Sequence, residues 1–158
     1  MTSFPLALES ALVSYIQSSI TGSITWPILK GHTDNFSGSF DLPVIAVVCD
    51  GYTEEIPGYS VYKADLRVDE VCNAHDAESY NNFDVVDDQI QTLLNDQDAV
   101  RAYVNSPSSS VFIAGIFLEQ NNTVVGENGG DFLNSRKYLV LTQQMFPSSS
   151  VIYPLSSS

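Results

Sequence analysis

Positive charge is scarce in this sequence. Six lysine and arginine residues stand against 19 aspartate and glutamate residues, which gives a formal net charge of -13 at pH 7. The cations are scattered along the chain and form no cluster in the sequence. A surface of this charge repels phosphate backbones and anionic lipid. The sequence therefore predicts no sequence-specific binding to nucleic acid and no attachment to a membrane.

Cysteine is also rare, and Cys49 and Cys72 are the two in the chain. The N-terminal stretch lacks a positively charged start, and polar residues interrupt its apolar ones, so we expect neither a secretory signal nor a membrane span there. Cysteines in such a chain are expected to be free thiols. In a hairpin that turns near Glu54 and Glu55, Cys49 pairs near Ser60 and Cys72 lies past the other end. That register excludes a disulfide.

A strong catalytic motif is missing as well. The serines lie in no nucleophile elbow, and the two histidines, His32 and His75, lie in loop-like segments. A Ser-His-Asp arrangement can form from residues far apart in sequence and stays open, although nothing points to one. The glycines of residues 126–130 match no phosphate-binding loop, because no lysine and Ser/Thr follow them.

Carboxylates and an imidazole at short spacing make six residues candidate metal ligands. They form two groups: Glu70, His75 and Asp76, and Asp84, Asp87 and Asp88. No second histidine or cysteine recurs at ligand spacing in the first group. The second group suits the positive end of a helix dipole. A polar strand end and a solvated helix start account for both groups, so we predict no metal, cofactor or catalytic residue.

Apolar residues at helical spacing predict two main helices and a short third one. The first covers residues 5–19, with its proline in the first turn. The second carries an apolar stripe from Phe83 to Leu94 and follows a polar linker, residues 73–82. The short helix covers residues 98–104 and stops before Pro107.

The clearest strand prediction covers residues 59–71. There, charged residues alternate with an apolar set, as in a strand with one face on a core: Tyr62, Ala64, Leu66 and Val68. Residues 42–49 and 111–118 are apolar runs typical of strands buried on both faces, and residues 136–144 form another strand. A short strand over residues 24–29 is weakened by Pro27.

Two polar segments, residues 52–58 and 119–135, are expected to be long connections. The resulting order, α-β-β-α-β-β, predicts a single α+β domain over residues 1–146, with a mostly antiparallel or mixed sheet packed with two main helices. Residues 147–158 form a serine-rich C-terminal tail. If the strands of residues 59–71 and 111–118 are neighbours, the helical crossover makes them parallel.

The exposed side of the clearest strand carries charges of alternating sign: Lys63, Asp65, Arg67 and Asp69. Such a row can face solvent, where each ion pair contributes at most about 1 kcal/mol. It can equally dock against another subunit. The residues leave both interpretations open.

The order and lengths of these elements resemble those of the tail terminator, or tail completion, proteins of tailed bacteriophages. The resemblance runs from Leu6 to Met145. It rests on a starting helix, LPVIAVVCDG, the strand YSVYKADLRVDEV, the helix around FDVVDDQIQTLL, and the strands VFIAGIF and RKYLVLT.

The resemblance implies a structural virion protein without an active site, assembled in the host cytoplasm. Its subunits would form a homo-oligomer, a hexameric ring at the head-proximal end of the tail tube, which stops tube polymerisation and joins the tail to the neck or head. The implied partners are the tail tube protein and a neck or head-completion protein, and an acidic lumen would let DNA pass. The candidate contact residues are Lys63, Asp65, Arg67, Asp69, Glu54, Glu55, Glu127, Asn128, Arg136 and Lys137.

Three alternatives stay open. Another neck or head-completion protein would share the virion role and differ in its neighbours. A small metal-dependent hydrolase would use the two groups of candidate ligands. An acidic adaptor that mimics DNA would be monomeric and would bind a basic protein tightly.

Overall fold

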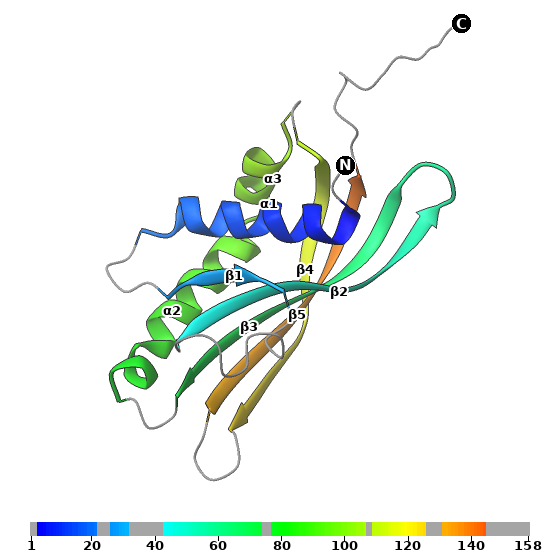
Figure 1. Ribbon diagram of the computed structural model, residues 1–158. Coiled ribbons are helices and arrows are strands. Elements are labelled where there is room, and N and C mark those ends of the chain that lie inside the picture. Colours follow the sequence, from blue (N-terminus) through cyan, green and yellow to red (C-terminus); the bar gives the residue numbers. More distant parts are fainter. Residues whose placement is uncertain are drawn as a thin grey trace, which may run out of the picture.

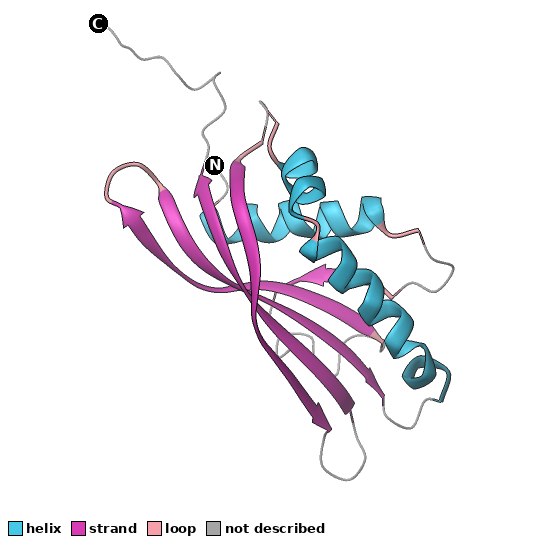
Figure 2. Cartoon of the chain, turned by 180° about the vertical axis from the view of Figure 1, so that it is seen from behind, coloured by secondary structure: helices cyan, strands magenta, loops and turns pink. Residues whose placement is uncertain are grey.

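Three helices lie on one face of a five-stranded sheet (Figures 1 and 2). The computed structural model describes residues 3–21, 26–31, 43–73, 77–106, 109–125 and 131–144. Together the helices and the sheet form one α+β domain, as the sequence predicts. The serine-rich tail and the predicted boundary between residues 146 and 147 lie outside the described residues.

Helix α1, Phe4–Ser19, confirms the first predicted helix. Helix α2, Ala77–Asn95, begins well before Phe83, so the prediction of a linker over residues 73–82 is wrong for its second half. The polar residues there continue the helix because its buried stripe starts one turn earlier, at Ser79. Helix α3, Gln97–Val104, confirms the short third helix.

The sheet is mixed, with strand order β1-β2-β3-β5-β4. The strands are β1, Ile28–Lys30; β2, Val44–Ile56; β3, Val61–Asn73; β4, Val111–Val125; and β5, Asp131–Gln144. Strand β1 is parallel to β2, and the other neighbours are antiparallel. The conditional prediction of a parallel pair between β3 and β4 does not apply, because β5 lies between them.

Strands β2, β4 and β5 are longer than the sequence predicts. Residues 52–56 belong to β2 and the turn occupies residues 57–60, so the predicted turn near Glu54 and Glu55 is wrong. Likewise, most of residues 119–135 continues β4 and β5. Polarity suggested loops in both places. Their backbones are instead paired across long hairpins, which satisfies the main-chain hydrogen bonds while the side chains of residues 52–56 and 119–123 stay exposed.

The register also corrects the expected position of Cys49, which pairs with Leu66 and not near Ser60. Cys72 lies near the other end of β3, and both cysteines are free thiols. None of the described helices is long and apolar enough to cross a membrane.

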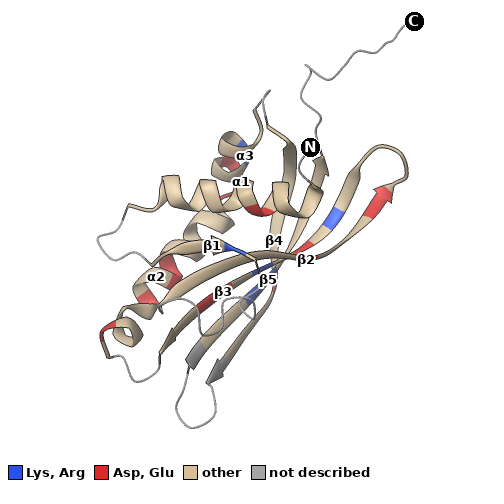
Figure 3. Cartoon of the chain, in the orientation of Figure 1, with Lys and Arg blue, Asp and Glu red and all other residues tan. Residues whose placement is uncertain are grey.

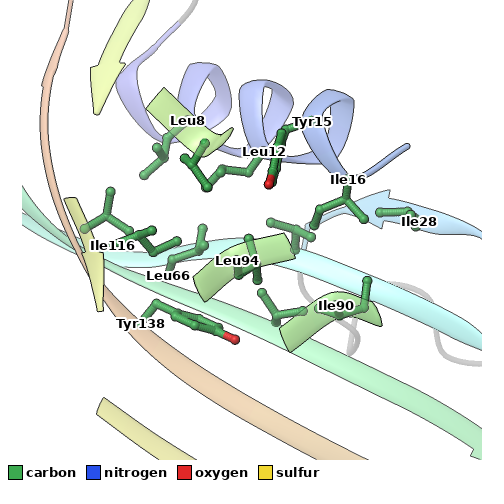
Figure 4. Packing of buried hydrophobic residues seen from close by; sticks show 14 of the residues in the cluster. Leu8, Leu12, Tyr15, Ile16, Ile28, Leu66, Ile90, Leu94, Ile116 and Tyr138 are labelled. Atoms are coloured by element: carbon green, nitrogen blue, oxygen red, sulfur yellow. The ribbon is translucent and has the colours of Figure 1, made fainter. Parts of the chain in front are cut away.

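The core fills the space between the helices and the near face of the sheet (Figure 4). Helices and strands both contribute fully buried side chains: Leu8, Leu12, Ile16, Leu66, Ile90 and Leu94. Burying one such side chain contributes about 1.5–3 kcal/mol relative to exposure. The hydroxyl of Tyr15 donates to the carbonyl oxygen of Leu93 over 2.7 Å, which ties α1 to α2.

Helix α3 shields part of the sheet edge at β4. Asn105 donates to the carbonyl oxygen of Ile113 over 2.8 Å and accepts from its amide over 2.7 Å. Gln97 makes the same pair of contacts with Ile116: it donates to the carbonyl oxygen and accepts from the amide over 2.9 Å. Each side-chain amide therefore takes the place of a neighbouring strand, and unpaired edge groups invite pairing with other chains.

Candidate functional site

The charged row on β3 lies on the sheet face turned away from the helices, called the far face from here on. Lys63 and Asp65 are exposed, as expected, while Ala64, Leu66 and Val68 point into the core. Asp69, in contrast, is buried. The expectation that Asp69 is exposed for a subunit contact is therefore wrong.

Arg67 is half-buried and held by acidic neighbours on the far face. Its Nε lies 3.1 Å from Oδ2 of Asp69, and its Nη1 lies 3.5 Å from Oδ1 of Asp50. It borders a shallow polar depression across four strands, lined by Asp50, Arg67, Gln120, Asn122, Ser135 and Lys137. The sheet register places Lys137 directly beside Arg67. The register thus places three cations, Lys63, Arg67 and Lys137, on the far face, and Figure 3 marks the charged residues along the strands.

An apolar patch adjoins these charges on the far face. It consists of Phe112, Phe117, Leu139 and Leu141. Phe117 pairs with Leu139 across the strands and is 49% exposed, and Phe112 is 41% exposed. A Cβ on Gly115 would lie 2.7 Å from the Phe117 ring, so only glycine leaves room for the ring there.

The prediction that residues 111–118 are buried on both faces is therefore wrong. Ile113 and Ile116 are buried, whereas Phe112, Phe117 and Leu118 are exposed. Edge strand β4 is covered by helices on one side alone. An irregularity between Ile113 and Gly115 shifts the alternation, so that no simple period-two pattern was visible in the sequence.

A buried charged cluster lies under α2, on the opposite side of the sheet from the apolar patch. Oε1 of Glu70 accepts from Nη1 of Arg136 over 3.1 Å and from Nδ2 of Asn134 over 2.9 Å. The same Nη1 also pairs with Asp87 of α2. The side chains of Glu70 and Arg136 are 0% and 3% exposed, and that of Asp87, on the side toward solvent, is 15% exposed.

One cation faces two carboxylates in this cluster. Burial, and the hydrogen bond to Asp87, raise the pKa of Glu70 to about 9. Burial alone would raise the pKa of Asp87 too, but hydrogen bonds from Arg136 and Glu70 lower it. At neutral pH the cluster is therefore a protonated Glu70 beside an Asp87–Arg136 ion pair, which leaves no net buried charge.

The four candidate metal ligands that the structure describes are not assembled into a site. Glu70 and Asp87 meet, but Arg136 occupies the position between them. Asp84 and Asp88 are exposed in the middle of α2, so the interpretation of the acidic group as a helix start is wrong. His75 and Asp76 lie outside the described residues. Among the residues that the structure describes, no group of three or more His, Cys, Asp or Glu side chains can hold a metal ion.

The remaining candidate contact residues lie in different parts of the structure. Glu54 and Glu55 are exposed near the end of β2, and Lys137 is half-buried on the far face. Arg136 is buried in the charged cluster, so the prediction that it is a contact residue is wrong. Glu127 and Asn128 lie outside the described residues.

No protein-family model matches the sequence, and no curated protein matches it. The fold is nevertheless similar to that of a chain in the solved structure named "Virion of native gene transfer agent (GTA) particle". The TM-score is 0.56 and the sequence identity is 10%. The match covers 89% of this chain and 99% of that chain. At this identity the likeness establishes a shared fold.

Proposed function

We propose that this protein is a structural virion protein of a tailed phage or phage-like particle, and that it acts as a tail terminator. Its subunits form a ring on the head-proximal end of the tail tube. The ring stops tube polymerisation and joins the tail to the neck or head. The far face, with its cations and apolar patch, belongs to the surface through which subunits or partners make contact.

The observation that carries this proposal is the extent of the structural match. The match spans nearly the whole of both chains, so that the two share a complete domain rather than one common motif. The other chain belongs to a virion particle, and the element order of this chain independently resembles the tail terminator proteins. Fold likeness alone is a weak guide to function, so two separate lines of support are needed.

The buried charged cluster favours a structural role over hydrolysis. An active carboxylate must reach its substrate or an attacking water. Glu70 is fully buried and Asp87 is paired with Arg136. Melting with and without magnesium, manganese or zinc tests the hydrolase: a specific site would raise the midpoint with ion concentration, and we expect no shift.

Electron microscopy of tails tests the terminator role directly. Particles that lack this protein should carry tubes of uncontrolled length that fail to join heads, and adding the purified protein should cap the tubes with a ring. Binding to heads in place of tube ends would assign the chain to the neck. Normal tube length and normal joining in its absence would refute the proposal.

The connection of residues 126–130, which contains Glu127 and Asn128, is proposed as a contact with the tube or neck. Deleting these residues should leave the domain folded and impair the joining of tails to heads. A circular dichroism spectrum equal to that of the unmodified protein is the control for folding. Normal joining by the deletion variant would remove this segment from the contact surface.

A further inference from the structure

The end of the β2–β3 hairpin projects beyond the helices and the rest of the sheet (Figures 1 and 2). This segment, called the hairpin tip from here on, comprises residues 52–60. It presents three large apolar side chains to solvent: Tyr52 is 49% exposed, Ile56 is 48% exposed and Tyr59 is 68% exposed. Exposed apolar side chains gathered on a projecting segment mark a contact surface.

The hairpin tip is held in a fixed shape. The amide of Tyr59 donates to the carbonyl oxygen of Ile56 over 3.1 Å, and Gln143 donates to the carbonyl oxygen of Tyr59 over 3.1 Å. The amide of Gln144 donates to the carbonyl oxygen of Ser60 over 2.9 Å. Ser60 adopts a φ of 56°, which costs about 1 kcal/mol for a residue with a side chain. A preorganised segment loses less conformational entropy when it binds.

The hairpin tip and the apolar patch are complementary in charge. The tip carries Glu54 and Glu55 and no cation. The sheet register places Lys63 between Leu141 of the patch and Thr53 of the tip, and Lys137 lies two residues from Leu139, so both lysines border the apolar patch. Asp65 is the exposed carboxylate between them. Opposite charges around an apolar contact guide the correct encounter and fix its orientation.

A single chain cannot bring these two surfaces together. The tip is an extension of the same paired strands that carry the patch, and the ladder between β3 and β5 holds both in one sheet. Gln143, which binds the tip, lies beside Phe112 of the patch in the register. On a second copy of this chain, the acidic tip of one copy can reach the lysines that border the patch of the other.

We propose that the hairpin tip of one subunit docks on the apolar patch of the next subunit. Such a contact joins two different surfaces, and its repetition closes a ring when the rotation between copies is a whole fraction of a turn. This inference rests on the proposed ring, and it names the two surfaces that build it.

Complementary variants test the contact. One chain carries Ile56→Ser with Tyr59→Ser in the tip, and the other carries Phe112→Ser with Phe117→Ser in the patch. Each variant alone should be monomeric by native mass spectrometry, because its affinity for another copy of itself should fall about 100-fold or more. An equal mixture should form a dimer, because one intact tip meets one intact patch. Neither variant should change the circular dichroism spectrum.

Charge variants provide a second test that leaves the apolar residues in place. Glu55→Lys should prevent self-association while it keeps the hydrogen bond from the Ser60 amide to Glu54, and so should Lys63→Glu with Lys137→Glu in another chain. Mixing the two should restore a dimer, because the changed tip then meets a patch of opposite charge. The matched control is Val85→Ser with Leu29→Ser, which changes exposed apolar residues elsewhere and should assemble as the unmodified chain does.

Several results would overturn the docking proposal. They are assembly of a tip or patch variant at the unmodified affinity, mixtures that stay monomeric, and an unmodified chain that is monomeric at the highest soluble concentration. If deletion of residues 147–158 abolished assembly while the tip variants still assembled, the C-terminal segment, and not the hairpin tip, would be the partner of the patch. If a tip variant capped tubes as well as the unmodified chain does, the docking contact would be refuted. The proposed terminator role would not be affected by that result.

Discussion

Replacing Arg136 by methionine tests the view that the buried cluster depends on its one cation. The side chain of Arg136 is 3% exposed. Its guanidinium lies 3.1 Å from Glu70 and also pairs with Asp87. Methionine fills a similar volume and removes the charge. The carboxylate of Asp87, 15% exposed, is then left without its cation, and the protonated Glu70 loses a hydrogen-bond donor.

The expected loss in the free energy of unfolding is about 3–5 kcal/mol, as for other buried pairs broken from one side. For a chain of this length that corresponds to a fall in the melting midpoint on the order of 10 °C. Urea denaturation at neutral pH measures it, and an unchanged slope with denaturant shows that the folded and unfolded states keep their exposed areas. A loss below about 1 kcal/mol would refute the reasoning.

Two further variants show whether the effect comes from burial. Arg101 pairs with Asp98 on the surface, with side chains 39% and 94% exposed, so Arg101→Met should cost at most about 1 kcal/mol. Glu70→Gln should also cost little, because glutamine resembles the protonated glutamate and keeps the oxygen that accepts from Arg136 and Asn134. A large loss in Glu70→Gln would mean that Glu70 is charged in the folded protein.

The variant Glu70→Gln also distinguishes the effect of Glu70 on the pH dependence of stability from the effects of other titrating groups. Folding raises the pKa of Glu70 from 4.5 to about 9, because burial disfavours the charged form. Between these values the folded state holds a proton that the unfolded state has lost. The stability from this group is complete below about pH 4.5 and is lost as the pH rises to about 9. Glu70→Gln should remove this part of the decline.

The remaining predictions concern the fold. Asn105→Ala removes both hydrogen bonds to Ile113 and should cost about 1–2 kcal/mol in urea denaturation; no loss would mean that water replaces the amide. Leu12→Ala opens a cavity in the fully buried core and should cost about 2–5 kcal/mol, and a smaller loss in a thermal melt would show that the core collapses around it. Asp96→Ala removes the cap that accepts from the amide of Ala99 and should lower stability by about 1 kcal/mol.

Periodicity located the helices and strands well where a side of the element is buried. The stripe of α1 and the alternation along β3 were visible because burial selects apolar residues at fixed spacing. The ends of β2, β4 and β5 were missed. The side chains of residues 52–56 and 119–123 are exposed, so no periodic apolar selection acts on them, and these backbones are stabilised by cross-strand partners.

The candidate site was visible in part. Lys63 and Asp65 were placed on an exposed face by simple alternation, and the structure has them there. Arg136 was misplaced, because a charged residue normally indicates a surface position. Its burial depends on Glu70 of β3 and Asp87 of α2, which are distant in sequence and meet it through folding.

The sequence by itself determined an acidic α+β domain, its helices and the inner parts of its strands, because these follow from charge and from local apolar spacing. Tertiary structure alone decided the strand order, the partners of Arg136, and the positions of the hairpin tip and the apolar patch on one sheet. Those features depend on contacts between residues far apart in the chain, and neither composition nor period contains them. Phe117 illustrates the difference: the sequence places it in an apolar run, and the fold leaves it 49% exposed on the far face.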